Sequence, residues 1–167
     1  MSSSYHTFGP CMPSVKIGAL ASFATLSGYS ALGVAMENGE IEEVFHKRDK
    51  KTDGAGDAPA DVQVMGVECF INLRLSSWDQ TVLDTLKALN GSAVGTLLAT
   101  SGASFALYLP SSLDSPWVFP CCELLPSREP IGVQSNALTL RFRAWRYVGP
   151  TVSALAAGLP YSRTAPS

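Results

Sequence analysis

Charged side chains are scarce in this sequence. Asp, Glu, Lys and Arg make up 16% of its 167 residues, whereas an average soluble domain carries roughly 25%. A chain with so few charges either buries much of itself or contacts partners through its surface. The formal net charge of −2 gives no electrostatic reason to bind nucleic acid or an anionic membrane.

Histidines and long apolar runs are also lacking. His6 and His46 are the only histidines, and neither belongs to a Ser-His-Asp or Cys-His pattern on rigid elements. The most apolar stretches, 94–109 and 117–125, are interrupted well before the roughly 20 residues that a bilayer span needs. The Ser-rich N-terminus has no early Lys or Arg, so we expect no signal peptide. The sequence predicts neither an enzyme nor a membrane protein.

The cysteines show no spacing typical of a disulfide framework. They are Cys11, Cys69, Cys121 and Cys122, and we expect all of them to be reduced thiols in a cytosol-like compartment. The adjacent pair Cys121-Cys122 lacks the second pair that a zinc site requires. Buried thiols are the simplest interpretation, although the sequence leaves a thiol nucleophile open.

Signatures of metal and phosphate binding are missing as well. The acids Asp49, Asp53 and Asp57 do not have the spacing of an EF-hand, and no bidentate Glu follows them in register. The Gly-rich stretch DGAGDA lacks the Lys-Ser/Thr ending of a P-loop. We therefore expect no metal and no cofactor, and interpret this segment as a solvated loop.

What the sequence does contain is a series of short apolar segments separated by turn signals. This pattern predicts a mainly β (α+β) fold, an antiparallel β-sandwich or partly closed barrel with one flanking helix and a long polar loop. We expect an N-terminal arm (1–14), a β-sandwich domain (15–148) and a C-terminal tail (149–167). The expected strands cover 15–20, 23–30, 33–36, 40–45, 61–75, 94–100, 104–109, 117–125 and 137–148.

Turn residues and one proline refine these strands. Asn38-Gly39 favours a tight hairpin with 33–36 and 40–45 as its strands. Pro120 favours an edge position for 117–125. Residues 46–60 have almost no apolar content and predict a long charged loop. In 61–75 the alternation of apolar residues changes parity at Met65-Gly66, which predicts a β-bulge.

A single convincing helix is predicted over 78–89. Ser77 is the expected N-cap, with Gln80 completing a capping box, and Asn90-Gly91 ends the helix. Its apolar stripe has helical spacing and consists of Trp78, Val82, Leu83, Leu86 and Leu89.

The segment 137–148 has two sharply different faces. Leu138, Leu140, Phe142 and Ala144 form an apolar face, and Thr139, Arg141, Arg143, Trp145 and Tyr147 form the opposite one. Arginines interleaved with aromatics are typical of protein interfaces. They also occur where single-stranded nucleic acid binds, and a plain outer sheet face would have the same pattern.

The order of these features resembles the tail tube proteins of tailed bacteriophages. The resemblance runs from about Ser14 to Val148 and rests on LSGYSALGVAMENGEIEEVF (26–45), the polar loop, and DVQVMGVECFINLRLSSWDQTVLDTL (61–86). It implies a virion structural protein located in the tail and assembled in the host cytoplasm. Such subunits form stacked hexameric rings, contact other tail proteins, and let DNA pass through the lumen during ejection without specific binding.

The resemblance also implies roles for particular residues. Contacts between subunits are expected at His46, Lys47, Arg48, Asp49, Lys50, Lys51, Asp53, Asp57, Arg141, Arg143, Trp145 and Tyr147, and also in both terminal segments. Acidic residues expected to line the lumen are Glu37, Glu40, Glu42 and Glu43. Other interpretations stay open: a capsid decoration or tail-completion protein, or a carbohydrate- or nucleic-acid-binding β-domain.

Overall fold

The computed structural model describes residues 11–18, 22–36, 39–50, 61–92, 95, 97–99, 102–111, 115–126, 137–146 and 159–167. In this part of the chain the elements are β1 (Ser14–Ile17), β2 (Ser30–Ala31), β3 (Gly33–Ala35), β4 (Glu40–Lys50), β5 (Asp61–Trp78), α1 (Gln80–Ser92), β6 (Phe105–Leu109), β7 (Trp117–Leu124) and β8 (Leu138–Trp145). The predicted mainly β fold with a flanking helix is confirmed. The one helix of the described residues is not long and apolar enough to cross a membrane.

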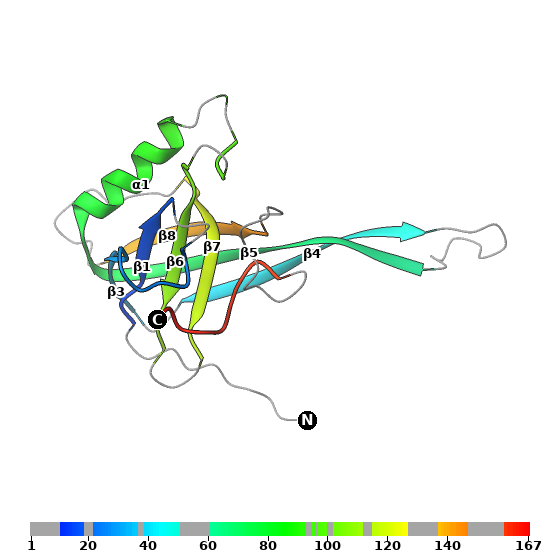
Figure 1. Cartoon of the computed structure of the whole chain (residues 1–167), viewed down its shortest axis with the longest axis horizontal. Coiled ribbons are helices and arrows are strands. Elements are labelled where there is room, and N and C mark those ends of the chain that lie inside the picture. Colours follow the sequence, from blue (N-terminus) through cyan, green and yellow to red (C-terminus); the bar gives the residue numbers. More distant parts are fainter. Residues whose placement is uncertain are drawn as a thin grey trace.

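The strands form one antiparallel sheet that curls into a barrel (Figure 1). Its order is β2-β1-β6-β7-β8-β5-β3, with β4 also paired to β5. Backbone hydrogen bonds close the barrel: the amide of Leu32 donates to the carbonyl of Pro13 (2.8 Å) and the amide of Ala35 to that of Cys11 (2.9 Å). The segment carrying β2 and β3 is thereby bonded to β1 on one side and to β5 on the other.

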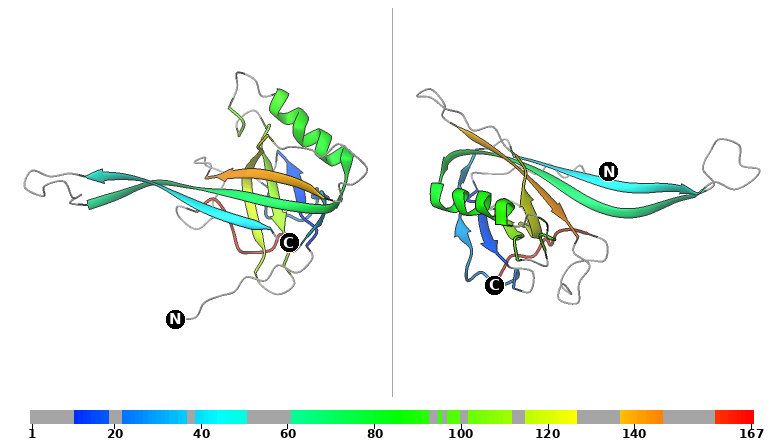
Figure 2. Two further views of the ribbon diagram at one scale, coloured as in Figure 1. Left: turned by 180° about the vertical axis from the view of Figure 1, so that it is seen from behind. Right: turned by 90° about the horizontal axis from the view of Figure 1, so that it is seen from above.

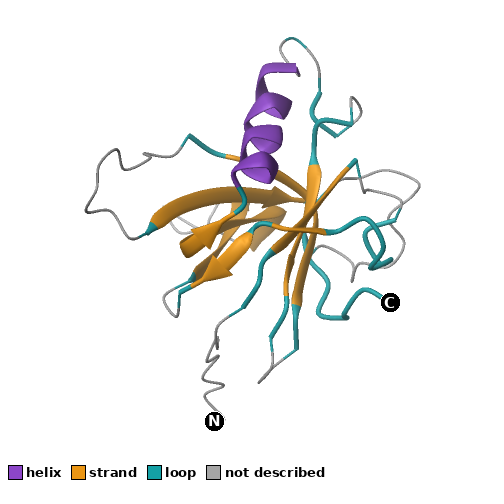
Figure 3. Cartoon of the chain, turned by 90° about the vertical axis from the view of Figure 1, so that its left-hand side faces the viewer, coloured by secondary structure: helices purple, strands orange, loops and turns teal. Residues whose placement is uncertain are grey.

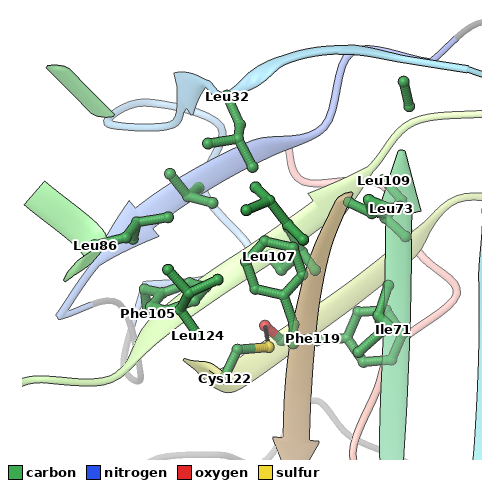
Figure 4. Close-up of a cluster of buried hydrophobic side chains, with 14 of the residues drawn as sticks. Leu32, Ile71, Leu73, Leu86, Phe105, Leu107, Leu109, Phe119, Cys122 and Leu124 are labelled. Atoms are coloured by element: carbon green, nitrogen blue, oxygen red, sulfur yellow. Dashed lines mark hydrogen bonds between the residues drawn. The ribbon is translucent and has the colours of Figure 1, made fainter. Parts of the chain in front are cut away.

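The inward side chains fill the barrel with a single large core (Figure 4). Phe105, Leu107 and Phe119 contribute to it from β6 and β7, and Ile71 from β5. On β8, burial alternates strictly, with Leu138, Leu140, Phe142 and Ala144 buried and Thr139, Arg141 and Arg143 exposed. This is the alternation that the sequence predicts, because the two faces of a strand differ with a period of two.

The helix α1 lies over one end of the barrel (Figures 1 and 3). Leu83 and Leu86 are buried in the core, as its apolar stripe predicts. The predicted cap is wrong: Asp79, not Ser77, accepts hydrogen bonds from the amides of Thr81 (2.9 Å) and Val82 (3.2 Å). Ser77 and Trp78 instead extend β5, because Ser77 pairs with Val34 of β3 and Trp78 pairs with Gly33.

Some predicted strands and one predicted hairpin are wrong. Of 23–30, only Ser30 is in a strand; the segment turns so that Phe23 packs against Ala106 and Val118 in a second cluster. The described residues of 94–100 form turns rather than a strand. Segments 33–36 and 40–45 do not pair with each other, because both β3 and β4 pair with successive parts of β5.

The predicted edge position of 117–125 is also wrong, since β7 lies between β6 and β8. Pro120 is tolerated there because neither ladder includes it. The register with β6 shifts between Phe105 and Leu107, opposite Pro120, and β8 pairs only with Cys122–Leu124. The missing amide hydrogen of Pro120 therefore costs no ladder bond.

The terminal segments fall partly outside the described residues. Residues 1–10 of the predicted N-terminal arm do so, while Cys11 is buried and Ser14 begins β1. Of the predicted tail, 159–167 pack on the chain's own barrel. Ser162 pairs with Val118, and the Tyr161 ring lies against Trp117 with centroids 4.7 Å apart.

Candidate interaction surface

The β4–β5 hairpin extends far beyond the barrel (Figures 1 and 2). β8 pairs with β5 only between Glu68 and Leu75, so Asp61–Val67 has β4 as its strand partner. We call residues 44–50 and 61–67 the projecting hairpin. His46–Lys50 were predicted to lie in a loop, which is wrong, because they pair with Asp61–Gly66 as strand.

A β-bulge lies at the root of the projecting hairpin. His46 pairs with Gly66 and Lys47 with Val64, so the register skips Met65. The predicted bulge at Met65-Gly66 is thus confirmed. The extra residue in β5 reverses the alternation of its side chains between the two faces. Val62 and Val64 therefore lie on the same face as Val67.

On one face of the projecting hairpin, β5 presents apolar side chains, while β4 presents Phe45 followed by the charged residues Lys47 and Asp49, which pair with Val64 and Val62. Direct cross-strand partners share a face: Phe45 is opposite Val67, and Val64 and Val62 follow on the same side. The same face of β5 continues into Cys69 and Ile71, which are buried in the core. We call Phe45, Val62, Val64 and Val67 the apolar strip. Nothing in the described chain covers it fully, since Phe45 is 47%, Val62 44% and Val64 55% exposed.

The opposite face is fixed to the barrel by a charged cluster. Glu68, only 8% exposed, accepts hydrogen bonds from Arg143 Nε and, at 2.8 Å, from His46 Nε2. Arg143 also donates to Glu123 (3.4 Å). Burial alone would raise the pKa of Glu68, but the bonds from Arg143 and His46 outweigh it and lower that pKa. The ionised carboxylate therefore ties β4 and β8 together at the root of the hairpin.

A groove of about 400 Å³ opens beside this cluster. Its lining comes from β4 and β5 (His46, Val64, Met65, Gly66, Val67 and Glu68) and from β8 and the residue after it (Arg143, Trp145 and Arg146). We call it the root groove. His46, Arg143 and Trp145 were predicted as contact residues, and the structure brings them together here. Glu68 and Glu123 were missed, because an outward Glu in a strand gives no sequence signal of its partner.

The other predicted contact residues are spread over two places. Lys47, Arg48, Asp49 and Lys50 are exposed on the projecting hairpin. Arg141 lies over the ring of Phe70, 4.8 Å from its centroid, on the outer face of β8. Lys51, Asp53, Asp57 and Tyr147 lie outside the described residues.

The predicted lumen residues do not all lie on one side of β4. Glu40 and Glu42 are exposed on its outer face, opposite Asn72 and Phe70. Glu43 faces the other way and accepts a hydrogen bond from Tyr161, a bond that contributes to raising the pKa of that tyrosine to about 12, after burial. Glu37 lies outside the described residues, and the lumen role of all of them stays a prediction.

The cysteines are all free and buried. Burial raises the pKa of Cys69 to about 12 and that of Cys121 to about 11. Such thiols stay protonated at neutral pH, and a protonated thiol is a poor nucleophile. Among the described residues no group of His, Cys, Asp and Glu is arranged to hold a metal ion.

No family model matches the chain, and no curated protein matches it. Among solved structures, it is similar to a chain of the cryo-EM structure of the anti-feeding prophage (AFP) baseplate, 6-fold symmetrised. The match covers 92% of this chain and 99% of that chain, with a TM-score of 0.48 and 10% sequence identity. A likeness at this level carries no argument about function.

Proposed function

We propose that this chain is a structural, non-enzymatic subunit that assembles with copies of itself through the projecting hairpin. The observation that supports this is the apolar strip. It continues the core-lining face of β5 out into solvent, with Phe45, Val62 and Val64 about half exposed. Neighbouring exposed apolar side chains on one strand support an interaction site there.

Burying the strip would contribute substantially to association. A fully buried Val or Phe side chain is stabilised by roughly 1.5–3 kcal/mol. Because these side chains are about half exposed, each would add about 1 kcal/mol per contact. Among the described strands, β4 pairs only with β5, and a strand edge of this kind tends to recruit further strands.

The geometry favours an assembly that is larger than a dimer. The projecting hairpin lies at one end of the long axis of the molecule (Figure 1). A contact between this end and a different surface of the next copy is heterologous, and heterologous contacts repeat into rings or filaments. In the tail tube form of this proposal, stacked hexameric rings make a tube in a phage virion, contact other tail proteins, and let DNA pass.

The test replaces one residue of the apolar strip. Val64→Lys puts a charge in the strip, whereas Gln63→Lys puts the same charge on the opposite, polar face of the same strand. We expect the unchanged protein and Gln63→Lys to form rings or tubes, and Val64→Lys to remain monomeric. Native mass spectrometry and negative-stain images measure this.

Two outcomes would contradict the proposal. One is an unchanged protein that stays monomeric at high concentration under several salt conditions. The other is a Val64→Lys variant that assembles as well as Gln63→Lys. Circular dichroism of each variant establishes that the barrel is still folded, so that a loss of assembly is not a loss of fold.

A further inference from the structure

The first residues of β7 have a strand partner on one side only. β6 pairs with β7 as far as Trp117, whereas β8 pairs with it only at Cys122, Glu123 and Leu124. Among the described strands, none therefore pairs with the other edge of 117–119. Backbone groups on a strand edge of this kind can pair with another extended segment, which then adds to the sheet.

This edge is occupied by the chain's own residues 159–167, which we call the C-terminal strap (red in Figure 1). The amide of Val118 donates to the carbonyl of Ser162 (3.0 Å), and the amide of Ser162 donates to the carbonyl of Val118 (2.8 Å). The pairing is antiparallel. The C-terminal strap therefore takes the position of an added strand.

Two side chains of the C-terminal strap contact the ring of Trp117. The Tyr161 ring meets it edge to face, with centroids 4.7 Å apart. The guanidinium of Arg163 lies 3.8 Å from the same centroid and donates to the carbonyl of Ser115 (2.7 Å). Residues two positions apart in an extended segment lie on the same face. The site at the start of β7 is therefore fitted to an aromatic residue followed, two positions later, by an arginine.

The attachment of the C-terminal strap to β7 is short. Ser162 and Val118 form a single bridged pair, whereas β6 pairs with β7 at four positions. Elsewhere the strap is held by a hydrogen bond from Tyr161 to Glu43 and by two backbone bonds that join Ser167 to 24–26. Because none of these contacts is a continuous ladder, the strap can open without unfolding the barrel.

The C-terminal strap also leaves one buried polar group of the site without a partner. The indole Nε1 of Trp117 is buried and has no hydrogen-bond partner among the described residues. A buried donor without an acceptor costs free energy. The strap therefore covers Trp117 without satisfying it, and a different segment with an acceptor at this point would fit the site better.

We propose that the start of β7 is a peptide-binding site that the C-terminal strap blocks in cis. When the strap opens, the edge at Val118 and the ring of Trp117 accept an extended segment of another chain, in which an aromatic residue precedes an arginine by two positions. This site is separate from the apolar strip, so the inference goes beyond the proposed self-assembly.

Hydrogen exchange tests whether the C-terminal strap opens. The amide of Val118 donates to Ser162 of the strap, whereas the amides of the β5–β8 ladder lie in the barrel wall. We expect the Val118 amide to exchange at least about tenfold faster than the ladder amides, because local opening needs less free energy than global unfolding. Exchange of Val118 as slow as that of the ladder would overturn the proposal.

Peptide binding tests the site itself. The probe is a fluorescein-labelled synthetic peptide of residues 159–167, and fluorescence anisotropy measures its affinity for the full chain. Ser162→Pro removes the amide that donates to Val118, whereas Ala165→Pro places the same residue at an exposed position of the strap. We expect Ser162→Pro to bind the peptide at least about tenfold more tightly than Ala165→Pro, because apparent affinity rises with the fraction of open sites. Equal affinities would contradict the proposal.

A second peptide tests the contacts with Trp117. It carries alanine in place of Tyr161 and Arg163, and we expect Ser162→Pro to bind it much more weakly than the unchanged peptide. Equal binding of the two peptides would show that Trp117 is not part of the site.

A second protein variant keeps the test valid if Ser162→Pro fails to fold, which circular dichroism would show. The double variant Tyr161→Ala with Arg163→Ala releases Trp117 and keeps every backbone amide of the strap. We expect it to bind the unchanged peptide more tightly than Ala165→Pro does. Failure of the folded double variant to do so would overturn the proposal.

All of these proteins also carry Val64→Lys, so that peptide binding is measured without assembly through the apolar strip. A loss of peptide binding in this background leaves the proposed self-assembly untouched. A failure of the unchanged protein to assemble leaves the peptide-binding site untouched. The two proposals are thereby tested separately.

Discussion

At Gly33, the backbone of β3 lies so near that of β5 that a side chain would not fit. A Cβ atom there would lie 2.1 Å from the carbonyl oxygen of Ser77, and φ is +155°. At Gly66, in the bulge, a Cβ would meet nothing within 4 Å. We expect Gly33→Ala to lower the free energy of unfolding by about 2–4 kcal/mol, and Gly66→Ala to change it by less than about 1 kcal/mol. Urea unfolding measures both, and equal losses would contradict the close approach.

Glu68 makes stability depend on pH. Its pKa is lower in the folded protein, so its contribution is present above the unfolded pKa of about 4.3 and is lost as the pH falls through the folded value. Glu68→Gln should therefore cost about 1–3 kcal/mol at pH 7 and progressively less as the pH falls below the unfolded pKa and through the folded one. The control is Glu42→Gln, whose side chain is exposed on β4. A constant cost across this range would show that Glu68 does not act through its charge.

At the scale of elements, the start of α1 is decided by Asp79. Its carboxylate accepts from two amides of the first turn, so Asp79→Ala should lower the free energy of unfolding by about 1 kcal/mol. Ser77→Ala should change it by less than about half of that, because Ser77 lies in β5. Thermal unfolding of the two variants compares them. A larger loss in Ser77→Ala would restore the cap that the sequence suggested.

What could be predicted from the sequence is what depends on neighbours along the chain. The alternation of buried and exposed side chains in β8 and the bulge at Met65-Gly66 are both present in the structure. Each could be predicted because it depends only on the order of a few consecutive residues. The extension of β5 to Trp78 depends instead on pairing with Gly33. The turns of 22–29 form because Phe23 packs on the outside of β6 and β7.

In the candidate site too, features that depend on nearby residues could be predicted, and features that depend on distant strand partners could not. Lys47 to Lys50 and Trp145 were predicted as contact residues from the resemblance, together with the charge of the first segment and the Arg and aromatic pattern around Trp145. The apolar strip was not predicted, because Val62 and Val64 resemble core residues until the structure shows that β8 ends its pairing at Glu68. The hydrogen-bond partners of Arg143 could not be predicted either, because Glu68 is 75 residues away in the sequence.

At the scale of the whole molecule, the buried cysteines report on global unfolding. Cys11 precedes β1, Cys69 is in β5 and Cys121 and Cys122 are in β7, and all of them are buried. Burial raises the pKa of Cys69 to about 12, so little thiolate is present at pH 8. We expect a thiol reagent to label none of them in the native protein and all of them at the rate of unfolding in urea. Rapid labelling of any one without urea would contradict this.

The continuity of β5 determines how the barrel responds to a mechanical force. It begins in the projecting hairpin, passes through the barrel wall and leads directly into Asp79 and α1. A pull on the hairpin along its length acts parallel to β5 and across the hydrogen bonds to β8, from Glu68–Trp145 to Leu75–Leu138. Bonds loaded in shear must break together, whereas bonds pulled apart from one end break in turn. The barrel is therefore built to resist tension that arrives through its hairpin.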